Sequence, residues 1–109
     1  MVKQVHLRRS IQERVNQFIH VLRKRGIKVS QVILFGSHAK GKANAESDLD
    51  IAIISEQFGE DPTEEMMLLR KLALTVDSHI EPIPLSPQDL KDHYSSLVEE
   101  IKRYGIRIA

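Results

Sequence analysis

The sequence predicts an α/β fold in which a small mixed β-sheet is flanked by helices. Short strand-like runs at residues 32–35, 48–54 and 78–85 alternate with longer stretches whose apolar residues recur at helical spacing. The chain has 109 residues and no cysteine. That length suits one domain, 1–109, with one modest core, and the composition offers no disulfide framework or thiolate metal site.

Charge and hydropathy exclude several classes of protein. The formal net charge is +1, so no strong field indicates binding to nucleic acid. No apolar run is long enough for a membrane span or a signal peptide, and the expected location is the cytoplasm. The basic segment 1–10 is interpreted as a solvated lead-in rather than as a phosphate-binding arm.

Residues 10–26 predict the first helix. Ser10 is the expected N-cap, with Glu13 at the capping-box position, and Gly26 fits the position just after the helix. One apolar stripe at helical spacing predicts packing on the sheet, and its members are Ile11, Val15, Phe18 and Leu22.

The stretch 31–54 carries the strongest functional pattern. An apolar run ends at Phe35 and is followed by Gly36 and Ser37. A strand that ends in Gly-Ser before a helical turn leaves backbone N–H groups free to hold phosphate oxygens. Glycine allows close approach of the backbone, and the Ser37 hydroxyl adds a donor.

Ten residues separate Ser37 from Asp48, where a second strand begins with Asp48 and Asp50. The apolar run 51–54 predicts burial of this strand on both faces. Residues two apart on a strand point to the same face. Two carboxylates so placed predict a site for a hard divalent cation such as Mg²⁺, which accompanies phosphate.

Asp61 and Pro62 predict the start of a second helix to about residue 76. Its apolar residues cover more than half of the helical wheel, which predicts either a partner surface or an unusually buried helix. The strand-like run 78–85 contains Pro82 and Pro84, which predict that it is an edge strand. A last helix is expected from Ser86 to Tyr104, with Tyr94 and Tyr104 packed on its apolar stripe, before a short final edge strand at 106–108.

One pattern in the stretch 31–54 resembles the signature of the DNA polymerase beta-like nucleotidyltransferases: Gly36-Ser37, ten intervening residues and then Asp48-x-Asp50. The short chain is similar to their minimal branch, which includes antitoxins. The resemblance implies a third acid from the neighbouring strand, for which Glu81 fits the register and Asp77 is the rival. It also implies a nucleotide contact near Lys40; His38 and Lys40 depart from the arginines that are common in the family.

The resemblance implies a nucleotidyltransferase that moves a nucleoside monophosphate, AMP from ATP, to an acceptor. Asp48, Asp50 and Glu81 would be catalytic and hold two Mg²⁺ ions, and Gly36, Ser37 and Lys40 would bind the nucleotide. The implied partner is a small helical HEPN-type RNase toxin, with self-association left open. One alternative is a subunit that neutralises such a partner by contact alone. Another is an adenylyltransferase for a small molecule, such as an aminoglycoside, which the absence of an acceptor domain disfavours.

Overall fold

The computed structural model describes residues 8–44 and 47–109, so most of the basic segment at the N-terminus lies outside the described residues. The elements in chain order are α1 (Arg9–Lys24), β1 (Gln31–Phe35), α2 (Gly36–Ala39), β2 (Leu49–Ile54), α3 (Pro62–Leu74), β3 (Ile80–Leu85), the 3-10 turn η1 (Asp89–Lys91), α4 (Ser96–Tyr104) and β4 (Ile106–Arg107). Within the described part of the chain, no helix combines the length and the apolar character that crossing a membrane requires.

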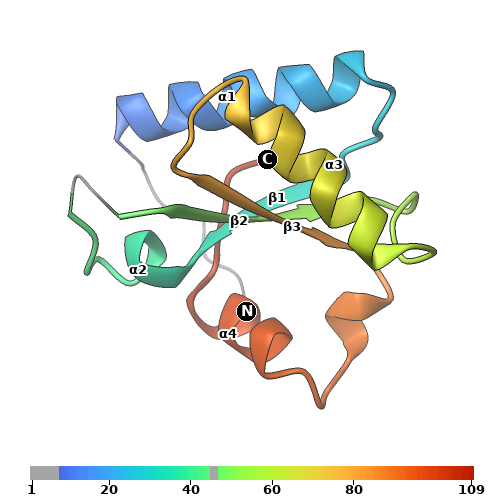
Figure 1. Cartoon of the computed structure of the whole chain (residues 1–109). Helices are drawn as coiled ribbons and strands as arrows, with labels where there is room; N and C mark the ends of the chain where they lie inside the picture. The colour runs from blue at the N-terminus through green and yellow to red at the C-terminus, as the bar shows by residue number, and fades with distance from the viewer. Residues whose placement is uncertain (1–7, 45–46) are drawn as a thin grey trace.

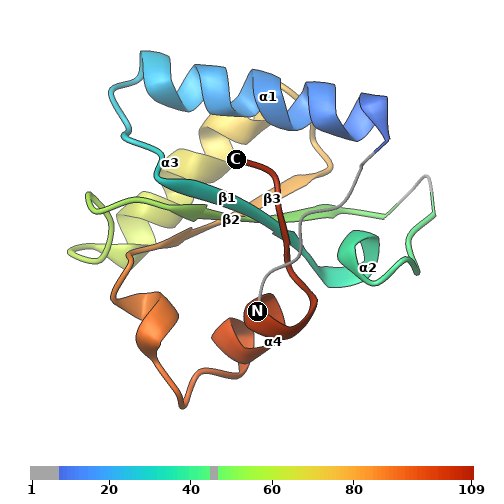
Figure 2. The ribbon, with the colours of Figure 1, turned by 180° about the vertical axis from the view of Figure 1, so that it is seen from behind.

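The four strands form one mixed sheet in the order β3-β2-β1-β4, which confirms the predicted architecture. β1 runs antiparallel to β2 and β4, whereas β2 and β3 are parallel. The strand with two prolines, β3, lies at one edge as predicted, and the short β4 lies at the other. Figures 1 and 2 show α1 and α3 covering one face of the sheet, α4 on the opposite face and the short α2 at one end of the sheet.

The core has two apolar layers, one on each face of the sheet. The larger layer joins α1 and α3 to the sheet and includes all four residues of the predicted α1 stripe, Ile11, Val15, Phe18 and Leu22. The smaller layer lies on the α4 side and includes Ile33, Ala52, Ile54 and Ile101. The two faces of β2 therefore contribute to different layers, and residues 51–54 are buried as the apolar run predicted.

The start of α1 differs from the prediction. The helix begins at Arg9, and its N-cap is Arg8, which makes no side-chain capping bond. Ser10 is therefore inside the first turn, and the predicted N-cap is wrong. Glu13 does not act in a capping box because its carboxylate accepts a hydrogen bond from Arg9 Nε at 3.0 Å. The other end agrees with the prediction, since Gly26 follows the C-cap with φ +89°.

The C-terminal region is not one helix. Ser86 and Asp89 exchange two hydrogen bonds, with distances of 2.8 and 3.2 Å, but these enclose only the turn η1. The backbone of Asp92 is extended, and its side chain accepts from the Tyr94 N–H at 2.9 Å. Ser95 then caps a separate helix, α4. Such local side-chain bonds compete with a continuous helix, and Tyr94, predicted to pack, is 98% exposed.

Helix α3 starts as predicted, because the Asp61 side chain accepts from the Glu64 N–H at 3.2 Å and Pro62 occupies the first turn. The broad apolar arc of α3 is only partly covered. Met67 and Leu74 are 61% and 68% exposed. The alternative of an unusually buried helix is therefore wrong, and part of the arc faces solvent.

Candidate active site

The Gly-Ser turn and the Asp-x-Asp strand meet at one end of the sheet. β1 ends at Phe35, which lies opposite Asp50 in the antiparallel register. Gly36 follows at once with φ +73°, a conformation that L side chains rarely adopt. A Cβ added at Gly36 would come within 3.0 Å of Asp50 Cγ and closer still to its carboxylate. The close contact between these two residues therefore requires glycine.

Ser37 lies in α2, which is only four residues long. A helix of this length cannot satisfy its first N–H groups internally, and these groups begin at the glycine that touches Asp50. The Lys40 N–H closes the turn on the Gly36 carbonyl at 3.1 Å, so Lys40 lies one turn from the glycine. His38 Nε2 is 3.3 Å from the Ser47 carbonyl, which joins α2 to the segment that enters β2.

The acids of the site repel one another. Burial raises the pKa of Asp50, the charges of Asp48, Glu81 and Glu100 raise it further, and the charge of His38 acts in the opposite direction. Asp48 is exposed and immediately precedes β2, which starts at Leu49 rather than at the predicted position 48. A carboxylate whose pKa is raised by other carboxylates nearby belongs to a set of donors suited to a cation.

The parallel register places Glu81 beside Asp50, as the resemblance implied. The Glu81 carboxylate is also 3.6 Å from Arg70 Nη2 on α3. In the arrangement adopted by residues 8–44 and 47–109, no three His, Cys, Asp or Glu side chains are placed to hold a metal ion. The oxygen donors of Asp48, Asp50 and Glu81 fit Mg²⁺ in chemistry and in register, but Glu81 is engaged by Arg70.

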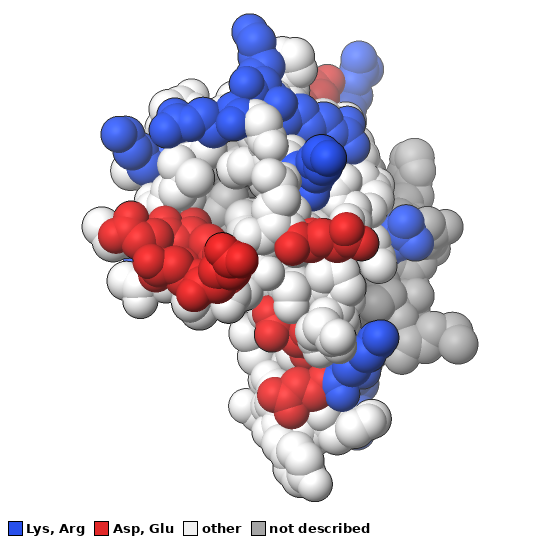
Figure 3. All heavy atoms as spheres, turned by 90° about the vertical axis from the view of Figure 1, so that its right-hand side faces the viewer, with Lys and Arg blue, Asp and Glu red and all other residues white. Residues whose placement is uncertain are grey.

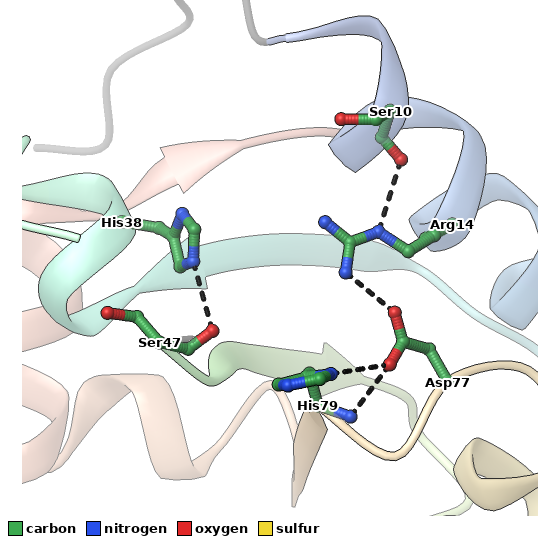
Figure 4. A network of polar contacts seen from close by, with 6 residues as sticks. All are labelled: Ser10, Arg14, His38, Ser47, Asp77 and His79. Atoms are coloured by element: carbon green, nitrogen blue, oxygen red, sulfur yellow. Dashed lines mark hydrogen bonds and ion pairs between the residues drawn. The ribbon is translucent and has the colours of Figure 1, made fainter. Parts of the chain in front are cut away.

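Asp77, the rival third acid, belongs to a different network (Figure 4). Its carboxylate accepts from Arg14 Nη1 at 2.6 Å and from the backbone N–H of His79 at 2.8 Å, and it lies 3.0 Å from His79 Nδ1. Burial would raise the pKa of Asp77, but the hydrogen bonds from Arg14 and His79 lower it to about 2. The network ties α1 to the entry of β3, and His79 is part of it.

Two residues near Lys40 were not identified from the sequence. Lys40 Nζ lies 3.0 Å from Glu100 Oε1 and 5.0 Å from the centre of the Tyr104 ring. Tyr104 was expected to pack on the apolar stripe of the last helix, yet it is 42% exposed. No local pattern connects residues 40 and 100, because their contact depends on how α4 folds back beside α2.

One protein with a named activity is similar to this chain over most of its length. The chain is 29% identical over 83 residues to the Methanocaldococcus jannaschii protein named "Putative protein adenylyltransferase MJ0141". The aligned region covers 74% of this chain and 80% of that protein.

Solved structures share the fold. One, described as a toxin-antitoxin with AMP-PNP, contains a chain that is 25% identical, with a TM-score of 0.63 and coverage of 86% of this chain and 71% of that chain. A chain from the complex of the tri-AMPylated Shewanella oneidensis HEPN toxin with MNT antitoxin is 23% identical, with a TM-score of 0.60 and coverage of 90% and 71%. At that identity the second likeness concerns the fold alone.

The family comparison covers most of the chain. The family model described as "Polymerase beta, Nucleotidyltransferase" matches residues 16–109, which include the Gly-Ser turn, both aspartates of β2 and Glu81. The resemblance that the sequence suggested is thereby confirmed: the chain belongs to the polymerase beta nucleotidyltransferase family and is a nucleotidyltransferase.

Proposed function

We propose that this nucleotidyltransferase moves AMP from ATP to a protein acceptor in a Mg²⁺-dependent reaction, and that the acceptor is a HEPN-type RNase toxin for which the chain is the antitoxin. The single observation that carries the proposal is the contact of Gly36 with Asp50, because the Gly-Ser turn thereby lies against the strand that carries the acids. Relatives named for protein adenylylation and for AMPylated toxin complexes support the choice of acceptor. ATP as donor implies a cytoplasmic setting.

The proposed roles follow from these positions. Asp48, Asp50 and Glu81 would hold Mg²⁺, with two ions as the expected number. When bound, Mg²⁺ supplies a Lewis acid that offsets the charge of the phosphate oxygens. The N–H groups of the turn at Gly36 and Ser37 would donate to the β- and γ-phosphates, and the ammonium group of Lys40 would add a positive charge.

The reaction itself requires little covalent chemistry from the protein. An acceptor hydroxyl oxygen forms a bond to the α-phosphorus, the bond from this phosphorus to the bridging oxygen breaks, and pyrophosphate leaves. Glu81 is half-exposed at the edge of the sheet, where it would take the proton of the hydroxyl if it does not hold metal. Most of the rate enhancement would come from positioning and charge neutralisation.

Helix α3 offers a surface for the protein acceptor. Met67 and Leu74 are exposed and seven residues apart, so they share one helical face. Arg70 lies between them on this face and forms the ion pair with Glu81. A helical partner bound on this face would thus lie beside the proposed site. A second copy of the chain is the alternative occupant.

The nucleotide site is tested by isothermal titration of ATP with and without Mg²⁺. We expect metal-dependent binding by the wild type and a loss of at least about tenfold in affinity in Asp48→Asn/Asp50→Asn, because the variant lacks two of the carboxylates proposed to hold Mg²⁺. The matched control is Glu56→Gln/Glu60→Gln, which removes the same charge from the loop between β2 and α3. That loop lies at the end of the molecule opposite α2, where acidic side chains gather (Figures 1 and 3). Equal binding by the wild type and the aspartate variant would sink the proposal.

The transfer itself is tested with a purified HEPN-type protein and ATP labelled at either the α- or the γ-phosphate. Transfer of AMP labels the acceptor from α-labelled ATP only. Label from γ-labelled ATP would indicate phosphorylation and contradict the proposal. The small-molecule alternative predicts that label appears on an aminoglycoside and not on protein.

A second candidate function is neutralisation of the partner by contact alone. One observation favours it: Lys40 and Glu81 are both engaged in ion pairs within the protein, with Glu100 and Arg70. This function predicts that the protein binds and inhibits the toxin without ATP, and that Asp48→Asn/Asp50→Asn inhibits as well as the wild type.

A further inference from the structure

Helix α4 brings two side chains to Lys40. Glu100 pairs with the ammonium group at 3.0 Å, and the ring of Tyr104, one helical turn later, lies beneath this group at 5.0 Å. Residues four apart in a helix lie on one face, so a single face of α4 makes both contacts. The Lys40 side chain is 30% exposed and that of Glu100 is 35% exposed, so the ion pair is accessible from solvent without being fully hydrated.

This cluster adjoins the candidate active site. Lys40 ends the turn that Gly36 begins, and Gly36 touches Asp50. Helix α4, which carries Glu100, packs against both α2 and β1. The backbone of Lys40 therefore belongs to the turn proposed for phosphate, and its ammonium group is held on α4, which packs beside that turn.

A free lysine would not remain in this position. Its four-carbon side chain has many rotamers, and ordering it on a ligand costs conformational entropy. A carboxylate on one side and an aromatic face on the other restrict these rotamers before a ligand arrives. Because an ammonium group has three donors, one can remain on Glu100 while the others reach phosphate oxygens.

We infer that Glu100 and Tyr104 are positioning residues that hold Lys40 ready for the triphosphate of the nucleotide. The inference rests on the proposed function, because it requires a nucleotide at this site. It adds α4 to the site and gives the half-exposed Tyr104 a role other than packing. Glu100 acts through Lys40, since its own negative charge would repel a triphosphate.

Glu100 is proposed to favour binding by holding Lys40 and to oppose it by repelling the triphosphate. Titration of MgATP can separate these two effects. In the wild-type background, Glu100→Gln releases Lys40, and we expect affinity to fall roughly 3- to 5-fold. In the Lys40→Met background there is no lysine to position, so the same change leaves affinity unchanged or raises it. Equal weakening in both backgrounds would mean that Glu100 only supports the fold, and unchanged or tighter binding in the wild-type background would mean that it positions nothing. Either result overturns the inference.

Tyr104 provides a matched pair of variants. Tyr104→Phe retains the ring under the ammonium group and is expected to keep wild-type affinity, whereas Tyr104→Leu is expected to weaken MgATP binding about 2- to 5-fold. AMP lacks the β- and γ-phosphates, so its affinity should stay within about twofold of wild type in all these variants. Equal losses for AMP and ATP would contradict the assignment to the triphosphate.

The outcomes also separate this inference from the proposed function. If the wild type binds MgATP and Asp48→Asn/Asp50→Asn does not, the proposed nucleotide site is supported. The Glu100 and Tyr104 variants then test the inference alone. If the wild type binds no MgATP, both are overturned together. Thermal unfolding of each variant identifies any that fail to fold, and Tyr104→Phe supplies the folded reference.

Discussion

The backbone of Gly36 lies directly against the carboxylate of Asp50. Gly36 has φ +73°, and any Cβ placed on it would meet the Asp50 side chain. The glycine thus does two things: it makes the turn from β1 into α2, and it leaves room for an acid on the neighbouring strand. The turn and the acid form one structural unit, so a change in either should affect the other.

Gly36→Ala should displace the Asp50 side chain and lower MgATP affinity at least about tenfold, in addition to roughly 1–2 kcal/mol of backbone strain. Gly41→Ala is the matched control, because Gly41 has the same φ of +73° and nothing within 4 Å of an added Cβ. It should show a similar loss in the free energy of unfolding but retain binding. Titration calorimetry with chemical denaturation separates the two effects, and equal affinity in both variants would show that the contact has no role in binding.

Asp50→Asn should stabilise the metal-free protein while removing metal binding. Burial and the neighbouring acids raise the pKa of Asp50 above 3.8, so ionising this group costs folding free energy. Stability linked to the protonated group is present at low pH and is lost as the pH rises through the folded-state pKa. We expect the variant to melt roughly 2–5 °C higher than wild type at pH 7 in EDTA, and this gain to shrink towards pH 4.

The control for this melt is Glu60→Gln, which removes an acid from the exposed loop before α3. It should leave the melting temperature within about 1 °C of wild type. A lower melting temperature for Asp50→Asn in EDTA would show that the Asp50 carboxylate stabilises the fold, contrary to the direction of its pKa shift.

The turn and the acidic strand could be predicted because their chemistry is local in sequence. Gly36, Ser37, Asp48 and Asp50 fall within 15 consecutive residues. Glycine, a short apolar run and alternation along a strand each have a direct conformational meaning. The pairing of Asp50 with Glu81 was not visible in this way, since nothing local sets the register between two strands separated by a helix; it followed only from the family resemblance.

Side-chain contacts over long sequence separations could not be predicted. Arg14 and Asp77 are 63 residues apart, and Lys40 and Glu100 are 60 residues apart. Both pairs depend on how the helices pack on the sheet. The predicted extent of the last helix was wrong for a different reason. The apolar residues of this segment recur at helical spacing, but the side chains of Asp92 and Ser95 accept hydrogen bonds from nearby backbone N–H groups and interrupt the helix.

Asp77→Asn should destabilise the protein by about 1–2 kcal/mol at pH 7, because its carboxylate joins α1 to the entry of β3. The pKa of Asp77 is lowered to about 2 from 3.8, so the stability it provides is present above about pH 4 and is lost as the pH falls towards 2. Chemical denaturation at several pH values measures this difference. Glu13→Gln is the control, since the Arg9–Glu13 pair is exposed and should contribute less than about 0.5 kcal/mol. A loss that persists unchanged at pH 3 would contradict the electrostatic origin.

Arg70→Met should strengthen metal binding, because it releases the Glu81 carboxylate that lies beside Asp50 in the sheet register. The ion pair is long, at 3.6 Å, and exposed, so releasing it should raise affinity for Mn²⁺ by no more than about 2- to 5-fold. Electron paramagnetic resonance of free Mn²⁺ measures this affinity without any need for an acceptor. Arg103→Met is a close control, since Arg103 pairs with Glu99 at the same 3.6 Å and its side chain is 64% exposed, against 62% for Arg70. If Arg70→Met and Arg103→Met change affinity equally, the effect comes from net charge alone. If Glu81→Gln binds Mn²⁺ as well as wild type, Glu81 is not the third acid of the site.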